Sequence, residues 1–141
     1  MALSAKLFLG NNQMGTYSHT YDVVECTYHF YRHHNRRFPD TKAKLDRAEI
    51  TVIAPGKEDT NLYEWYIEQI VNSGKIVFDL TTISEHTPQP MKVLTFENAT
   101  CFSIAEHYDI GKQKRRQLRL EIMAEEIVVE NVTFKQYIGS L

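Results

Sequence analysis

The chain has few of the residues that mark several common classes of protein. It holds two cysteines, Cys26 and Cys101, and their spacing fits neither a metal motif nor a disulfide framework. Both lie in strand-like runs, so we expect reduced, buried thiols in a reducing compartment. Apolar runs are also short, and none approaches the roughly 18 residues of a membrane-spanning helix.

The N-terminal segment MALSAKLFLG has too short an apolar stretch for the hydrophobic region of a signal peptide. We therefore expect a cytoplasmic protein that, if it leaves the cell, is exported without a cleaved signal. An excess of charge of one sign is lacking too, because the formal net charge is −2. That balance argues against a general nucleic-acid binder and against a membrane-surface protein.

What the chain does have is the composition of one globular domain. It contains 141 residues, of which 43% are hydrophobic and 24% are charged. We expect a single domain over residues 1–141.

Most of the chain shows the alternation of apolar and polar residues that is typical of β-strands. In the clearest strand, Val24, Cys26, Tyr28 and Phe30 are expected to point inward. The same alternation predicts inward positions in the next strand and in the last long strand: Ile50, Val52, Leu118, Leu120, Ile122 and Ala124. A strand that begins at Met91 is unusually long, which predicts a bend or bulge near Glu97 and Asn98. The segment 10–19 is expected to be a loop or a hairpin extension, and the tail from residue 131 a short strand or an arm. The predicted strands cover residues 5–9, 21–32, 48–54, 75–82, 91–104 and 117–129.

One convincing helix interrupts these strands. It is predicted to begin at Thr60 or Asn61, to continue through Val71, and to end before Gly74, a residue suited to a helix C-terminus. This helix is apolar on nearly every face, so it should be buried on more than one side. Either its own domain or a second copy of the chain would cover it.

Six or seven strands and one helix, without βαβ alternation, predict a mainly β fold. The expected architecture is an antiparallel β-barrel, or two packed sheets, with the α-helix on the side.

The order of these elements resembles the Hcp (TssD) family of type VI secretion tube proteins, in the form found in Bacteroidetes. The resemblance covers most of the chain and rests on several short motifs in their joint order. They are AKLFLG at 5–10, YDVVECTY at 21–28, RFP at 37–39, LYEW at 62–65, GKIVF at 74–78, FENA at 96–99 followed by Cys101, and EEI at 125–127.

The resemblance implies a structural, self-assembling protein with no catalytic role and no cofactor. Such subunits form hexameric rings, and the rings stack into a hollow tube. The tube grows inside a contractile sheath and is expelled with effector proteins in its lumen. The implied partners are further copies of the chain, the sheath, spike and baseplate proteins, and the effectors. A tail-tube protein of a related contractile injection system remains an alternative.

Three groups of residues are candidates for contacts in such an assembly. The helix would supply subunit contacts through Leu62, Trp65, Tyr66 and Ile70. The family's extended loop between its second and third strands points to a ring-stacking loop that contains Arg36, Arg37, Phe38, Pro39, Lys42 and Lys44. A basic cluster could line the lumen or meet acidic residues of the next ring, such as Glu125, Glu126 and Glu130; it consists of Lys112, Lys114, Arg115 and Arg116.

The sequence gives weaker support for a metal site, a nucleic-acid site or a catalytic site. His29, His33 and His34 would be good zinc or nickel ligands, yet on a strand His34 points away from the other two, and no nearby cysteine completes a set. The basic cluster lacks the interleaved aromatics of a nucleic-acid site. No nucleophile lies in a recognisable catalytic motif. The rival functions are a monomeric β-barrel that binds a ligand and, less favoured, a metal-dependent enzyme that uses His33 and His34.

Overall fold

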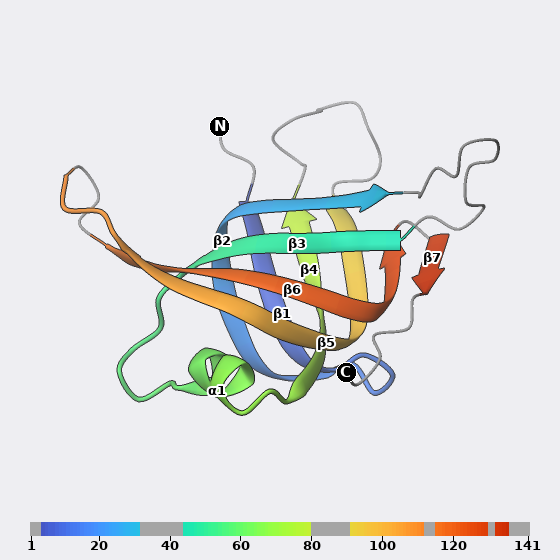
Figure 1. Ribbon diagram of the computed structural model, residues 1–141, viewed down its shortest axis with the longest axis horizontal. Helices are drawn as coiled ribbons and strands as arrows, with labels where there is room; N and C mark the ends of the chain where they lie inside the picture. Colours follow the sequence, from blue (N-terminus) through green and yellow to red (C-terminus); the bar gives the residue numbers. More distant parts are fainter. Residues whose placement is uncertain (1–3, 32–43, 80–90, 112–114, 130–131, 136–141) are drawn as a thin grey trace, which may run out of the picture.

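Antiparallel strands dominate the structure, and they close on themselves. A computed structural model describes residues 4–31, 44–79, 91–111, 115–129 and 132–135 (Figure 1). The elements are β1 (Ser4–Asn11), β2 (Thr16–Tyr31), β3 (Lys44–Ile53), α1 (Asn61–Ile67), β4 (Val71–Asp79), β5 (Met91–Tyr108), β6 (Arg116–Val129) and β7 (Val132–Lys135).

The strands form one sheet in the order β3-β2-β1-β4-β5-β6-β7, and a further pairing between β3 and β6 closes it into a barrel. All pairings are antiparallel; Ile50, for example, lies opposite Leu120 where β3 meets β6. Closure matters because it removes most of the unpaired strand edges that would otherwise invite aggregation. The predicted mainly β barrel with one helix is therefore confirmed.

Apolar side chains fill the interior of the barrel. The residues predicted to point inward from the last long strand are all buried, as are Ile50 and Val52 of β3. The largest fully buried side chains are Trp65, Phe96, Leu7, Leu9, Ile50, Leu62, Ile76, Leu94, Leu118, Leu120 and Ile122. Period-two alternation accounts for the strand residues among them, because the inner face of a barrel strand is covered and its outer face is not, whereas Leu62 and Trp65 come from α1.

Of two predictions about the geometry of the strands, the structure confirms one and contradicts the other. The bend expected near Asn98 is confirmed: Asn98 has φ +53°, and the β4–β5 register shifts opposite it, between Asn72 and Gly74. Val24, however, was expected to point inward, and it is exposed. The register of β2 against β3 shifts between Val23 and Glu25, so the bulge turns Val24 outward, while Val23 packs on the core.

The helix is shorter than predicted. It ends after Ile67, Gln69 takes a left-handed φ of +55°, and β4 begins at Val71. The prediction that the helix continues through Val71, with Gly74 at its C-terminus, is wrong. Residues 71–79 pair with β5 and residues 74–79 also pair with β1, so sheet pairing on both edges overrides helical propensity.

In three further segments, the ends of the strands can be compared with the predicted ones. The segment 10–19 is a hairpin extension, because β1 runs to Asn11 and β2 starts at Thr16. β3 begins at Lys44, earlier than the start at residue 48 that the sequence predicts. The tail contributes β7, which pairs with the end of β6.

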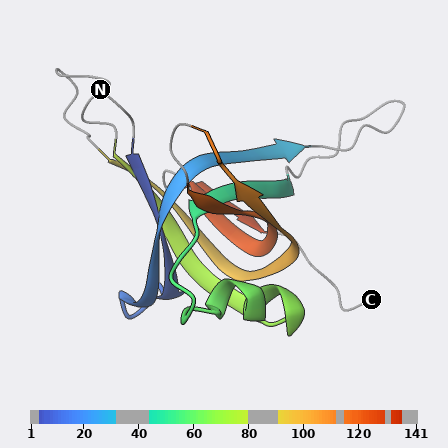
Figure 2. The ribbon, with the colours of Figure 1, turned by 90° about the vertical axis from the view of Figure 1, so that its left-hand side faces the viewer.

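Past the end of the β4–β5 pairing, β5 and β6 continue together as a ribbon, here called the arm (residues 104–111 and 115–118). β3 pairs with β6 as far as Gln117, so only the tip of the arm is two-stranded. In Figure 1 it extends to the left, above α1, and Figure 2 views the molecule from that side. β4 pairs with β5 only as far as Thr100, whereas the β5–β6 pairing continues to Tyr108. Within the described ranges, no helix has the length and apolar character needed to cross a membrane.

Candidate functional site

Helix α1 is fastened to the barrel by two side chains. Leu62 and Trp65 are fully buried, and the Trp65 indole Nε1 donates a 2.9 Å hydrogen bond to the Ala99 carbonyl of β5. The pairing satisfies the one polar atom of a large buried aromatic ring. One face of this short helix therefore belongs to the core of its own chain.

The other side of α1 and the turn after it leave apolar side chains in contact with solvent. The exposed fraction is 40% for Tyr66, 68% for Ile67, 40% for Ile70 and 55% for Val71. We call these four apolar residues, two on either side of Glu68 and Gln69 in the sequence, the apolar strip. Scattered exposed apolar residues are ordinary, but a group of this kind is typical of an interaction surface.

The four predicted subunit-contact residues thus fall into two pairs. Leu62 and Trp65 face the core of their own chain and offer no surface to a partner, so that part of the assignment is corrected. Tyr66 and Ile70 are exposed, although Ile70 lies after the helix and not within it. A direct contact with a second copy stays a prediction for these two residues.

A polar cluster around Glu106 holds the arm against the segment before β4. The hydroxyls of Tyr63, in α1, and of Tyr108 donate hydrogen bonds to the two carboxylate oxygens of Glu106. Arg116 lies 3.4 Å from the same carboxylate and also donates to the Pro55 carbonyl, at 3.3 Å. We call this group the Glu106 clamp.

Electrostatics at the clamp follow from these contacts. The hydrogen bond from Tyr63, followed by that from Tyr108, lowers the pKa of Glu106, because both favour the charged carboxylate. Partial burial, and next the hydrogen bond to Glu106, raise the pKa of Tyr63. No local sequence pattern predicts this cluster, since Tyr63 and Glu106 lie 43 residues apart and nothing near either residue links the two.

The basic cluster is only partly described. Arg115 lies beside the arm's turn and Arg116 is the first residue of β6, while Lys112 and Lys114 fall outside the described residues. Together with Tyr108, Asp109 and Ile110, the two arginines line an open hollow of about 440 Å³. A role in the lumen or in charged contacts remains a prediction.

The ring-stacking loop cannot be placed in the same way. Arg36, Arg37, Phe38, Pro39 and Lys42 lie outside the described residues, and of this set only Lys44 is located, as the first residue of β3. His33 and His34 lie outside them as well. Among the residues the structure describes, no group of three or more His, Cys, Asp or Glu side chains is placed to hold a metal ion.

An acidic hollow of about 410 Å³ lies beside the start of α1, lined by His19, Glu58, Asp59, Thr60, Asn61 and Glu64. At its wall the Tyr21 hydroxyl donates to both carboxylate oxygens of Asp59, at 3.2 and 3.1 Å. Burial above all raises the pKa of Tyr21, so its hydroxyl stays protonated and serves as a structural donor.

The two cysteines are free thiols with no sign of activation. Cys101 is buried and Cys26 is half-buried. Burial raises the pKa of each thiol to about 11, which keeps the reactive thiolate scarce at neutral pH.

Both the sequence and the fold of this chain are similar to those of known proteins. The family model "Hemolysin coregulated protein Hcp (TssD)" matches residues 1–137. The fold is similar to that of Hcp1 from Flavobacterium johnsoniae, at 19% sequence identity and a TM-score of 0.72, over 94% of this chain and 99% of that one.

Two further solved structures share the fold. One is an Hcp1 double mutant from the E. coli EAEC 042 pathovar, at 11% identity and a TM-score of 0.67, over 98% of this chain and 100% of that one. The other is Hcp1 from Salmonella typhimurium, at 11% identity and a TM-score of 0.62, over 94% and 91% of the two chains. A comparison with curated protein sequences gave no match.

Proposed function

Because this chain belongs to the Hcp (TssD) family, we propose that it is a structural subunit of the inner tube of a type VI secretion system. Copies form hexameric rings, the rings stack into a hollow tube, and a contractile sheath expels the tube with effector proteins in its lumen. Its partners are then other copies, the sheath, spike and baseplate proteins, and the effectors. The protein acts without catalysis, and it leaves the cytoplasm through the secretion machine.

The observation that carries this proposal is the family match over residues 1–137, nearly the whole chain. The apolar strip supports it, since a subunit of a ring needs an apolar surface for its neighbour. The packed barrel argues against the rival ligand carrier. Such a carrier keeps space for its ligand inside the barrel, and here Phe96, Leu120 and Ile122 are among the side chains that fill the interior.

The mass of the purified protein in solution tests the proposal. Light scattering on a sizing column should give a particle about six times the 16.5 kDa chain mass, and negative-stain images of that peak should show rings. A protein that stays monomeric at every concentration and salt level tried would contradict the proposal. The ligand-binding barrel would then be the function to test.

The stacking loop gives a second test of the same proposal. Replacing residues 36–43 with a shorter linker leaves β3 intact, because that strand begins at Lys44. We expect this variant to form rings with the wild-type mass but few or no tubes in electron micrographs. A Gly-Ser segment of unchanged length is the matched control, since it separates loss of the loop's side chains from loss of its length. Disappearance of the rings themselves would contradict the stacking role.

A further inference from the structure

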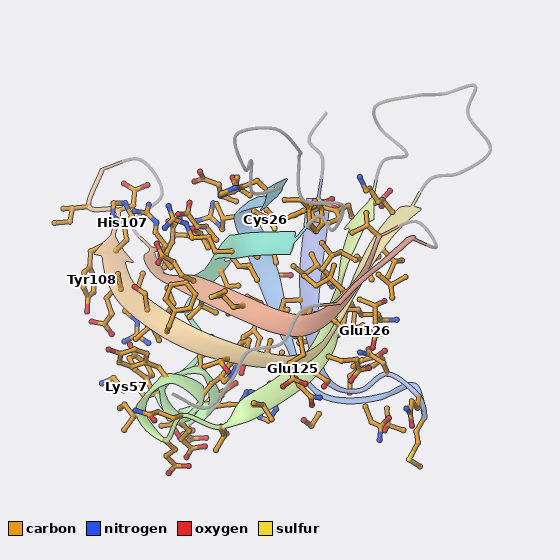
Figure 3. All side chains as sticks on the ribbon, turned by 45° about the vertical axis from the view of Figure 1, so that its right-hand side comes forward. Cys26, Lys57, His107, Tyr108, Glu125 and Glu126 are labelled. Atoms are coloured by element: carbon orange, nitrogen blue, oxygen red, sulfur yellow. The ribbon has the colours of Figure 1, made fainter. Side chains whose placement is uncertain are left out.

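The ribbon formed by β5 and β6 is polarised in charge along its length. Its arm end, residues 104–119, carries five basic residues and two acidic ones. Its other end, residues 91–98 and 120–130, carries five glutamates and one lysine. Figure 3 shows the two ends well apart, with His107 and Tyr108 on the arm and Glu125 and Glu126 toward the opposite side of the barrel.

At the arm end, positive charge lies next to exposed apolar side chains. Ile110 is 84% exposed and Tyr108 is 57% exposed, and both line the open hollow that Arg115 and Arg116 also line. Arg119, exposed on β6, lies opposite Ala105 and adds another cation. Glu106 offsets the charge of Arg116, so Arg115 and Arg119 are the cations in the described part of the arm end that the clamp does not use.

At the other end, the glutamates share the ribbon with Val93 of β5, which is 38% exposed, and Val71 of the apolar strip lies two strands away from β6. Glu97 and Glu126 lie directly opposite each other on β5 and β6; the Asn12 side chain donates to Glu97 at 3.0 Å, and Lys135 of β7 lies opposite Glu126 on its other side. Glu125 accepts a 3.2 Å hydrogen bond from the side chain of Asn98. The exposed Val71 pairs with Thr100, which pairs with Met123, two residues before Glu125.

We propose that these two ends bind each other between copies, so that the arm of one chain docks head-to-tail on the Glu125–Glu126 end of the next. The proposal rests on the assembly proposed above and names its contact surfaces. Each surface combines exposed apolar side chains with charge, and the charges are of opposite sign. A contact between two different surfaces is heterologous, and repeated copies of it close into a ring or continue as a filament.

Charge complementarity selects a second copy as the occupant. Two arms together, or two glutamate ends together, would bring like charges into contact, whereas a head-to-tail contact unites unlike charges. The acidic end would repel a nucleic acid that approached both surfaces, and the net charge of −2 gives no general attraction for one. The contact should weaken as salt rises, because exposed charges are screened within about 8 Å at physiological ionic strength.

Two charge-reversed variants and their mixture test this contact. In R115E/R119E both ends of the ribbon are acidic, and in E125K/E126K both ends are basic. We expect each variant alone to remain at the monomer mass of 16.5 kDa where the wild type assembles. An equimolar mixture should regain the wild-type mass, because each arm then meets an end of opposite charge on the other variant. The control K6E/K57E makes the same net charge change as R115E/R119E at exposed residues outside the ribbon, and it should assemble normally.

The outcomes separate the two proposals. If the wild type forms rings and either reversed variant, folded by circular dichroism, assembles as well as the wild type, the head-to-tail contact is wrong and the tube function stands. The same holds if both variants fail alone and their mixture also fails. If the wild type itself stays monomeric under all conditions, the tube function and this contact fall together. Recovery of assembly in the mixture alone would support the contact.

Discussion

At the scale of single residues, close backbone approaches decide which amino acid a position accepts. Gly74 lies within β4, where a Cβ atom would stand 2.0 Å from the Phe8 carbonyl oxygen and 3.1 Å from Cζ of Phe96. Asn12, from the β1–β2 turn, donates to the Gly74 and Phe96 carbonyls, both at 3.0 Å. The glycine therefore lets three strands and a turn come together, a role unrelated to a helix C-terminus.

Gly74→Ala should lower the free energy of unfolding by about 3 kcal/mol, because the new methyl group meets backbone that cannot move aside cheaply. Urea denaturation followed by the fluorescence of Trp65 measures the change. Gly56→Ala is the matched control, since no atom lies within 4 Å of a Cβ at that position. If the two variants were equally stable, the backbone of β1 would not lie close enough to Gly74 to exclude a methyl group.

At the scale of elements, α1 and the arm depend on contacts outside themselves. A seven-residue helix is too short to be stable alone in water, so packing through Leu62 and Trp65 is what holds it. The arm lacks β4 on one edge, and its tip, beyond the β3 pairing that ends at Gln117, is a two-stranded ribbon that is marginal by itself. The Glu106 clamp joins these two marginally stable elements, because Tyr63 of α1 donates a hydrogen bond to Glu106 of the arm.

The clamp should respond to pH at both ends of the scale. The pKa of Glu106 is lowered, so its contribution is present above the unfolded value of about 4.3 and is lost as pH falls through the folded value. The pKa of Tyr63 is raised, so its contribution is present below about 10 and is lost as pH rises through the folded value.

Amide hydrogen exchange in the arm is the measurement that follows this attachment. Protection should fall as the solution is acidified through the lowered pKa of Glu106, because the protonated carboxyl loses the clamp. Glu106→Gln should reduce protection at pH 7 and remove the acid transition, whereas Glu64→Gln, in the exposed part of α1, should leave both unchanged. An arm equally protected in wild type and Glu106→Gln would show that the clamp does not hold it.

At the scale of the whole molecule, the barrel covers its own core and leaves specific surfaces exposed. The interior is packed, and the large apolar side chains in contact with solvent include those of the apolar strip and the arm. The fold therefore separates residues that stabilise the subunit, such as Leu62, from residues available to a neighbour, such as Tyr66.

The double variant Tyr66→Ala/Ile70→Ala should weaken ring formation about tenfold or more in the concentration required, as expected when interface anchors are truncated. Subunit stability should fall by only about 1–2 kcal/mol, because both side chains are 40% exposed and lose part of their packing on their own chain. Light scattering across a dilution series checks the first expectation, and urea denaturation the second. Val24→Ala, which truncates an exposed apolar residue on β2, is the control. Normal assembly of Tyr66→Ala/Ile70→Ala would remove these residues from the subunit interface.

The sequence by itself determined the β class, the barrel with one helix, the inward faces of β3 and β6, and the bulge at Asn98. Those features follow from period-two alternation, which is a local property that a single covered face imposes on each strand. The ordered motifs also led to the correct family, because they are spread over most of the chain.

Only the tertiary structure decided where α1 ends, which way Val24 points, and which apolar residues remain exposed. Residues 71–79 pair with β5, and residues 74–79 also pair with β1, which is distant in the chain; this pairing outweighs their helical pattern. The Glu106 clamp likewise joins residues 43 positions apart. The physical reason is the same in each case: pairing and packing energies come from partners distant in sequence, and a local pattern carries no record of which partner is present.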